Sequence, residues 1–386
     1  MYTGSLKKVA IVINSPKNLI KVSPLIDKIS RFYDSLEPII IYTGKLFGKS
    51  DSGYLFDQLS LPQPNIYLNI KSSTYSEMTA GVMLETEKCF SELSPDMIVV
   101  IGGSCSALGA SISAARMGIK ITHIEAGLRC HNNISNTDIN RKLVDSISDI
   151  FFVTDSTAHS NIFEEGIPDD RIFFVGNIMV DTLYKFLPLS RKSKMLNKLG
   201  LVPKKYAMLT LHRKSNTCNF DIVKGIISAA RQISEKIPVV FTCYKRVRKE
   251  IEEFGLHNYF DDKKLIMCDL SKYYDFLALE SNASFLMTDS GTMQVESSVL
   301  GIHCLTLRKN TEWIVTVKEG SNTIVGTYPE KIIAGAEMIM SNKKKIRGVP
   351  KYWDGNTSER IVEVIAKSFP YEDPSTRKIK TSSISE

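Results

Sequence analysis

Imidazole, carboxylate and guanidinium groups gather in one short segment of the sequence, between His123 and Arg141. The segment begins within an apolar, β-branched run at 120–124, which predicts a strand. Side chains alternate along a strand, so the pattern predicts that His123 and Glu125 point to the same face. Open α/β sheets bind their ligands at the carboxyl ends of the strands, where these groups stand. Glu125 could therefore act as a general base or acid, or it could only form a salt bridge to Arg129 or Arg141.

A second polar group follows another apolar run, in the sequence Thr-Asp-Ser-Gly-Thr at 288–292. A predicted helix comes next. Free backbone N–H groups at a helix start, with the hydroxyls of Ser290 and Thr292, can hold a phosphate, and Gly291 permits its close approach. Glu296 lies about one turn further, where it could accept hydrogen bonds from ribose hydroxyls. The alternative is an ordinary helix cap without a ligand, because Asp and Ser are good capping residues.

A histidine in a basic cluster follows a third apolar run. His212 comes directly after the predicted strand at 207–211 and is followed by Arg213 and Lys214. The neighbouring cations disfavour protonation of the imidazole, and a bound diphosphate would reverse that effect. His212 could thus act on a leaving phosphate, and a purely structural histidine is the alternative.

Strand-length apolar runs alternate with amphipathic segments, which predicts βαβ units and parallel sheets. The alternation restarts after residue 205, so we predict an α/β fold of two Rossmann-like domains that face a cleft. The expected parts are a first domain, a linker, a second domain and a flexible tail, at 1–182, 183–204, 205–366 and 367–386. Neither half has a Gly-x-Gly-x-x-Gly sequence after its first strand, which argues against a nicotinamide cofactor.

The amino-acid composition limits which binding partners and which cellular compartment we expect. The 386 residues, 43% hydrophobic and 24% charged, are typical of a soluble protein of about two domains. The apolar runs are far shorter than the roughly 20 residues of a membrane span, so we expect no membrane insertion. Seven widely spaced cysteines without a Cys-x-x-Cys pair favour reduced thiols in the cytoplasm and give no support for a metal site. The net charge of +7 would suit an anionic nucleotide, and we expect no nucleic-acid partner.

These segments together resemble the non-hydrolysing UDP-N-acetylglucosamine 2-epimerases. The resemblance follows the family's order through most of the chain, at 123–141, 211–214, 288–296, 308–312 and 354–361. It implies a glycosyltransferase-B-type architecture with UDP bound by the second domain, no cofactor, and a homodimer. The implied reaction inverts C2 of a UDP-N-acetylhexosamine, converting UDP-GlcNAc to UDP-ManNAc by elimination and re-addition of UDP.

The resemblance also assigns roles to individual residues. Glu125, His212 and Asp138 are the expected catalytic groups. The expected substrate-binding residues are His123, Asn140, Arg141, Arg213, Ser290, Gly291, Thr292, Glu296 and Arg308.

Several carboxylates of the family are missing from this chain. The family's Gly-Asp-Thr is Gly-Gly-Ser at 102–104, and Thr137 replaces a glutamate, which leaves Asp138 as the one nearby acid. Three hypotheses follow: an epimerase with an altered carboxylate set, a UDP-sugar glycosyltransferase of the same architecture, or a catalytically silent nucleotide-sugar binding protein. For the first, we predict that Gly103→Asp combined with Thr137→Glu raises the activity on UDP-GlcNAc.

Overall fold

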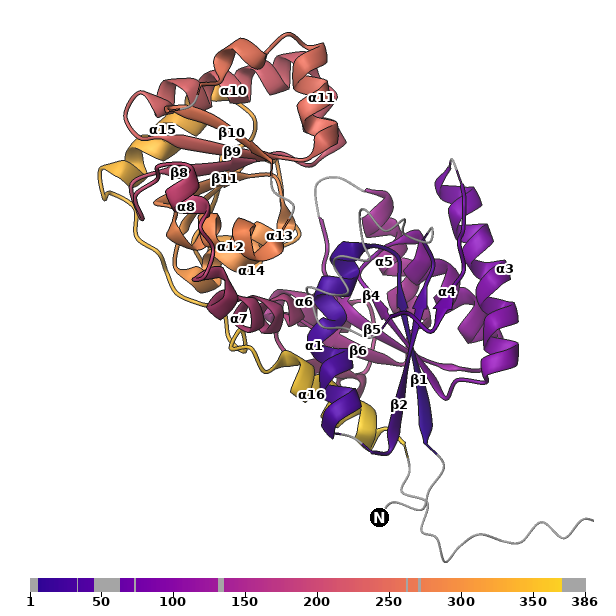
Figure 1. The fold of residues 1–386 in the computed structure, drawn as a ribbon. Coiled ribbons are helices and arrows are strands. Elements are labelled where there is room, and N and C mark those ends of the chain that lie inside the picture. Colours follow the sequence, from indigo (N-terminus) through magenta and orange to yellow (C-terminus); the bar gives the residue numbers. More distant parts are fainter. Residues whose placement is uncertain are drawn as a thin grey trace, which may run out of the picture.

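Two parallel β-sheets, each covered by helices on both faces, make up the molecule (Figure 1). The computed structural model describes residues 6–32, 34–44, 63–72, 74–130, 135–261, 263–269 and 272–369. The first sheet has the strand order β3-β2-β1-β4-β5-β6-β7, and the second has the order β10-β9-β8-β11-β12-β13. In both, the order reverses direction beside the first strand, as in doubly wound folds, and the carboxyl ends of the strands there are where ligands bind.

The strands of the first sheet are β1 Lys7–Ile13, β2 Leu36–Tyr42, β3 Ile66–Tyr67, β4 Met97–Ile101, β5 Lys120–Ala126, β6 Ile150–Val153 and β7 Ile172–Phe174. Its helices are α1 Pro16–Phe32, α3 Tyr75–Leu93, α4 Cys105–Arg116, α5 Asn136–Ile147, α6 Ser156–Glu164 and the short η1 Asp169–Arg171. Two further helices lead toward the second sheet, α7 Ile178–Ser190 and α8 Met195–Lys198.

The second sheet contains β8 Ala207–Thr210, β9 Val239–Cys243, β10 Leu265–Asp269, β11 Phe285–Thr288, β12 His303–Thr306 and β13 Asn322–Ile324. Its helices are α9 Lys214–Thr217, α10 Phe220–Ser234, α11 Lys245–Glu253, η2 His257–Tyr259, α12 Tyr273–Asn282, α13 Gly291–Leu300, α14 Ile314–Lys318 and α15 Pro329–Met340. The last helix of the chain is α16 Thr357–Lys367.

Continuous apolar strands explain why helices cover both faces of each sheet. In β1, Val9 and Ile11 belong to the core beneath α1, whereas Ala10 and Val12 belong to the core beneath α3 and α4. A strand with two buried faces must be apolar at every position. The runs at 97–101, 239–243 and 285–288 are completely buried strands, as their sequences predict.

The segment predicted as a linker is largely helical, which corrects the boundary at 183–204. Helix α7 begins at Ile178 and continues to Ser190, with Pro188 in its last turn. Leu183 and Phe186 are buried in the core that α7 shares with α1. The apolar side chains between residues 178 and 187 therefore outweigh the Pro and Ser residues that indicated a linker.

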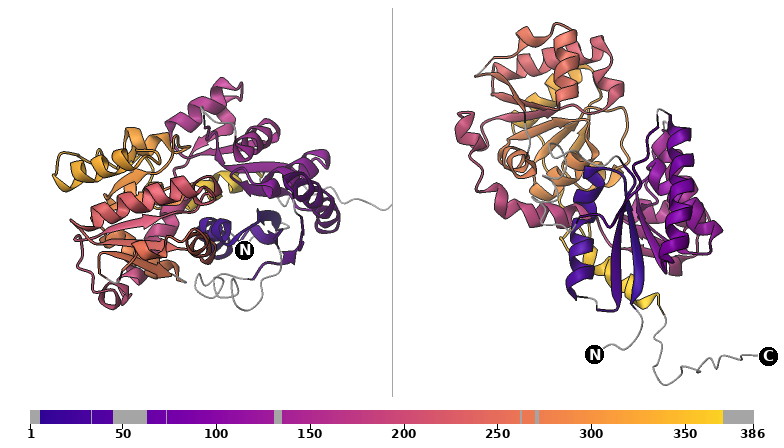
Figure 2. Two further views of the ribbon diagram at one scale, coloured as in Figure 1. Left: turned by 90° about the horizontal axis from the view of Figure 1, so that it is seen from above. Right: turned by 45° about the vertical axis from the view of Figure 1, so that its right-hand side comes forward.

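The chain returns to the first domain at its end, which corrects the predicted second domain of 205–366. Helix α16 contacts α1 and α7, and Ile361, Val362 and Ile365 complete the core beneath α1. In Figure 2, helix α16, at the yellow end of the colour scale, lies beside the indigo elements from the beginning of the chain. The predicted tail at 367–386 lies outside the described residues from position 370 onward.

Candidate functional site

The carboxyl end of β5 contains an irregularity that separates the side chains of His123 and Glu125. The register with β6 shifts between Ile124 and Ala126, and Glu125 adopts a left-handed backbone conformation with φ of 65°. The bulge interrupts the two-residue alternation. His123 consequently contacts α5 and Glu125 contacts α1, on opposite faces of the sheet, so the prediction that they share a face is wrong.

His123 is completely buried and contacts both α5 and the residue that follows β4. Its Nδ1 lies 2.6 Å from Asp145 Oδ1, and its Nε2 lies 3.0 Å from the carbonyl oxygen of Gly102. Arg129 also contacts Asp145, at 2.8 Å. Burial raises the pKa of Asp145, but His123 and Arg129 outweigh it and the net pKa is lowered. Both ring nitrogens of His123 are occupied by these contacts, which link the end of β4 to β5 and α5, and its role in substrate binding stays a prediction.

Glu125 pairs with a lysine that the sequence reasoning missed. Lys21 Nζ lies 2.7 Å from Glu125 Oε1, and the glutamate side chain is only 2% exposed. Neither Arg129 nor Arg141 is its partner in the structure, because Arg129 pairs with Asp145 and Glu165. A non-glycine residue with positive φ costs about 1–3 kcal/mol and is retained where its surroundings require it. Such strain is typical of functional sites, and α1 is the element that supplies the compensating cation.

The loop after β4 leaves no room for the missing carboxylate. A Cβ atom on Gly103 would lie 2.1 Å from the carbonyl oxygen of Thr137 and 2.8 Å from Arg141 Cγ. Ser104 caps α4 by accepting a hydrogen bond from the N–H of Ala107. Because α5 packs directly on Gly103, an aspartate there would displace this helix, and the gain in activity from Gly103→Asp with Thr137→Glu stays a prediction.

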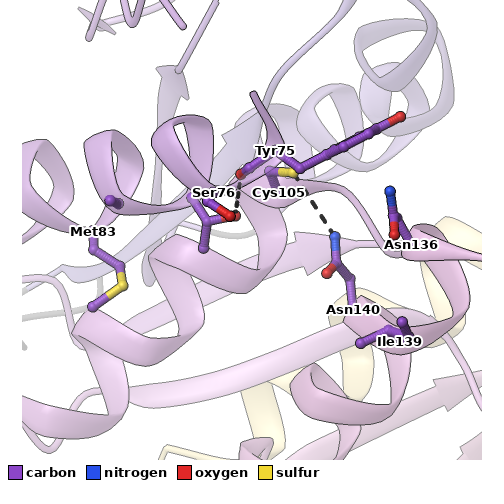
Figure 3. A pocket seen from close by; sticks show the side chains of 9 residues that line it. Tyr75, Ser76, Met83, Cys105, Asn136, Ile139 and Asn140 are labelled. Atoms are coloured by element: carbon purple, nitrogen blue, oxygen red, sulfur yellow. Dashed lines mark hydrogen bonds between the residues drawn. The ribbon is translucent and has the colours of Figure 1, made fainter. Parts of the chain in front are cut away.

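The first two turns of α5 carry Asp138 and Asn140, two of the predicted site residues. Asp138 is buried and accepts a hydrogen bond from the backbone N–H of Cys130, at 3.0 Å. Asn140 donates to the carbonyl oxygen of Gly103, at 3.2 Å. Asn140 also points toward Cys105 at the edge of a pocket of about 380 Å³ (Figure 3). This pocket is bounded by the amino-terminal halves of α3, α4 and α5, and none of the other predicted site residues lines it.

In the second domain, Asp289 organises the loop that carries His212. Its carboxylate accepts hydrogen bonds from the backbone N–H groups of His212 and Arg213, at 2.8 and 3.0 Å, and from the side chain of Asn216. Burial raises the pKa of Asp289, and these donors oppose the rise. The imidazole of His212 is half-buried and packs 4.8 Å from the ring of Tyr244, centroid to centroid. Asp289 thus fixes the backbone of His212 while its ring stays partly accessible.

The start of α13 fits a phosphate group. Ser290 is the N-cap residue, yet its hydroxyl makes no capping hydrogen bond, and Ser290, Gly291 and Thr292 are all partly exposed. A Cβ on Gly291 would lie 2.9 Å from Trp313 Nε1 and 3.1 Å from Glu312 Oε1. Uncapped N–H groups at the positive end of a helix attract anions.

Glu312 interacts with arginine side chains of both domains. Its Oε2 accepts a hydrogen bond from Arg308 at 2.6 Å, and its Oε1 lies 3.4 Å from Arg213. Cys130 of the first domain lies 4.0 Å from Oε2, and Arg141 is close enough to influence its charge. Burial alone would raise the pKa of Glu312, but the three arginines hold it at about 2. Arg308 Nη1 and Arg141 Nε are buried without a partner among the described residues, so guanidinium donors remain for an anionic ligand.

Glu296 is completely buried behind the first turn of α13. Its Oε1 accepts a hydrogen bond from the hydroxyl of Tyr273, and its Oε2 has no partner that donates from the described residues. Burial raises its pKa to about 7. An acceptor with an open lone pair at this position is suitable for a hydroxyl ligand, although the ligand can reach it only if a covering side chain moves.

The described part of the chain contains no group of three His, Cys, Asp or Glu side chains that could bind a metal ion. Among the same residues, no helix is long and apolar enough to cross a membrane.

The sequence matches the family model described as UDP-N-acetylglucosamine 2-epimerase over residues 30–366. The chain belongs to this family. A UDP-N-acetylglucosamine 2-epimerase from Methanococcus maripaludis is 34% identical over 366 residues, covering 93% of this chain and 98% of that protein. The UDP-2,3-diacetamido-2,3-dideoxy-D-glucuronate 2-epimerase of Pseudomonas aeruginosa is 30% identical, covering 93% and 99%.

A solved structure of another family member shares the arrangement of both domains. The crystal structure of Methanocaldococcus jannaschii UDP-GlcNAc 2-epimerase in complex with UDP-GlcNAc and UDP matches with a TM-score of 0.84 and 33% identity, over 93% of this chain and 99% of that one. The predicted fold, two Rossmann-like domains of glycosyltransferase-B type, is confirmed for this 2-epimerase family member.

Proposed function

We propose that this protein epimerises C2 of UDP-N-acetylglucosamine and gives UDP-N-acetylmannosamine, by elimination and re-addition of UDP. The observation that carries the proposal is the match of both domains to a 2-epimerase whose crystal structure contains UDP-GlcNAc and UDP. The two halves of the site support it. One offers donors for a diphosphate, and the other offers a buried carboxylate beside a cation.

The second domain would hold the nucleotide while the bond between C1 and the phosphate oxygen breaks. The uncapped start of α13 at Ser290, Gly291 and Thr292 would bind the diphosphate. Arg213 and Arg308, both neighbours of Glu312, would balance its charge. Charge accumulates on the leaving diphosphate, so fixed donors there stabilise the transition state more than the ground state. His212 would add a hydrogen bond or a proton to the leaving phosphate.

The first domain would supply the groups that remove the proton from C2 and return it. Glu125 would remove it as UDP departs from C1, which leaves a glycal, and a proton would return to the opposite face of C2 before UDP adds again to C1. Lys21 keeps the Glu125 carboxylate fixed at 2.7 Å. Two faces of one carbon require two proton-carrying groups, and Asp138, in the first turn of α5, is our candidate for the second. Asn140 and Arg141, on the same helix, would shape the sugar site.

Proton NMR of UDP-GlcNAc in deuterated water with the purified protein tests the proposal directly. Epimerisation replaces the C2 proton by deuterium and produces UDP-ManNAc. Glu125→Gln is the matched control, because it preserves the shape of the side chain and should abolish the exchange. Release of UDP without exchange at C2 would indicate a transferase or hydrolase instead. Binding with neither exchange nor release would indicate a silent nucleotide-sugar binding protein.

We also propose that the protein is a homodimer that forms through α3 and α5. Helices α3 and α5 both pack against α4, and they expose large apolar side chains at Tyr75, Leu84, Ile139 and Leu143. Burial of such side chains against a second copy would remove apolar surface from water. Sedimentation equilibrium of the native protein and of Leu84→Glu tests this, and a monomeric native protein would contradict it.

All seven cysteines are free thiols, which supports a cytoplasmic location.

A further inference from the structure

A second glutamate is buried against Glu296 and has no role in the site described so far. Glu280 lies on α12, which packs on α13, and both carboxyl groups are 0% exposed. The two carboxyl groups interact with each other, and they are placed to share a hydrogen bond when one of them carries a proton. No hydroxyl, amide or cation of the described residues donates to either oxygen of Glu280. Two buried carboxylates in contact cannot both carry a charge, so the pair must share a proton.

The surroundings decide which carboxyl group keeps that proton. The hydroxyl of Tyr273 donates to Glu296 and stabilises its negative charge, whereas Glu280 has no such donor. Among the described residues, the other titratable groups that interact with the pair are Tyr244 after β9 and the thiol of Cys304 on β12, and neither is a cation. Burial and the neighbouring Glu296 raise the pKa of Glu280 well above its usual value. The proton therefore belongs to Glu280 at neutral pH.

We propose that Glu280 is a positioning residue for nucleotide binding: its carboxylic acid donates a hydrogen bond to Glu296 and holds that group as a carboxylate that accepts from the ribose hydroxyls. The inference deepens the proposed function and rests on the nucleotide site at α13. Tyr273 and Glu280 approach Glu296 from α12, which leaves lone pairs of Glu296 for the ligand. Tyr244 is 52% exposed and interacts electrostatically with Glu296, and we infer that it is the side chain that moves aside when the ligand enters.

The proposal has a consequence for the pH dependence of binding. The pKa of Glu296 is raised to about 7, and a ligand that donates hydrogen bonds prefers the carboxylate form. Affinity should thus rise as the pH increases through about 7 and fall below it. Without the hydrogen bond from Glu280, Glu296 would hold its proton more tightly, and this rise would shift to higher pH.

Calorimetric titration of UDP-GlcNAc between pH 6 and 8 separates the outcomes. The ligand is suitable because its diphosphate is esterified at both ends and lacks the phosphate group that titrates near pH 6. We expect Glu280→Leu to bind about tenfold more weakly at pH 7, since it removes a hydrogen bond to a charged group, and to shift the pH midpoint upward. Glu280→Gln retains a donor of the same shape and should restore both. Tyr273→Phe removes the other donor and should shift the midpoint in the same direction as Glu280→Leu.

A folded Glu280→Leu protein with the native affinity and the native pH profile would overturn the inference. Replacement of a buried acid by an apolar side chain is often neutral or stabilising, so this variant should fold. A native protein that binds UDP-GlcNAc but exchanges no C2 proton would refute the epimerase function alone. A native protein that does not bind UDP-GlcNAc would refute the inference together with the nucleotide site.

Discussion

Replacement of Glu312 by glutamine should destabilise the protein in a manner that depends on pH. The carboxylate is 11% exposed and contacts Arg308 and Arg213, and Arg141 of the other domain contributes to its field. Its pKa falls from 4.5 to about 2 on folding. By linkage, that fall corresponds to about 3 kcal/mol of stability at pH 7.

The sign of the effect follows from the direction of the pKa change. A lowered pKa stabilises the folded state above the unfolded value of 4.5, and this contribution is lost as the pH falls toward about 2. Glu312→Gln should therefore lower the free energy of unfolding by about 3 kcal/mol at pH 7, and the difference should shrink to about 2.5 kcal/mol by pH 4. Urea denaturation at several pH values measures it. Glu319→Gln, a change at an exposed carboxylate nearby, is the matched control and should have almost no effect.

An unfolding free energy of Glu312→Gln within about 0.5 kcal/mol of the native value at pH 7 would refute this reasoning, because surface substitutions commonly stay in that range. A deficit that does not depend on pH would also contradict it. That result would assign the cost to packing of the side chain and not to its charge.

The other predictions concern the proposed nucleotide site of the second domain and the packing of α5 on Gly103. His212→Ala should reduce turnover by about 10²–10⁴-fold and leave the melting temperature nearly unchanged; a loss of stability with full specific activity would show that His212 is structural. Gly291→Ala should abolish UDP binding in calorimetry, because the new Cβ would meet Trp313 at 2.9 Å, and unchanged affinity would contradict this. Glu296→Gln should weaken UDP-GlcNAc by about 1–3 kcal/mol, and equal affinity would exclude the ribose contact. Gly103→Ala should lower the melting temperature, because its Cβ would meet a backbone oxygen of α5 at 2.1 Å.

The central strands of both sheets could be predicted from the sequence because they are buried on two faces. Runs such as 97–101 and 239–243 contain only residues that fit that environment, and the structure places strands there with the same bounds. Edge strands are different. β3 has two residues and β13 has three, and so short a segment gives no periodic pattern. Helices α7 and α16 were assigned to the wrong part because their burial depends on contacts with α1, far away in the chain.

The places of the candidate site residues in the fold were predictable, but the geometry between their side chains was not. Segments of distinctive sequence indicated Glu125, His212 and Ser290, and each lies at the carboxyl end of a strand or the start of a helix. The opposite directions of His123 and Glu125 depend on a single left-handed residue, which alternation cannot predict. Lys21 and Glu280 were missed because each approaches its partner from a separate helix. Only the three-dimensional fold shows that Lys21 lies beside Glu125 and that Glu280 lies beside Glu296.

The return of α16 to the first domain means that the polypeptide passes between the domains twice. The first passage follows α7 and α8, and the second precedes α16, where the indole N–H of Trp353 donates to the carbonyl oxygen of Thr154. Two covalent connections restrict the separation of the two domains more than a single connection would. The first domain is therefore not a continuous stretch of sequence, and an expression product that ends before residue 357 would lack part of its core. Exchange of domains between family members must likewise transfer the last helix together with the beginning of the chain.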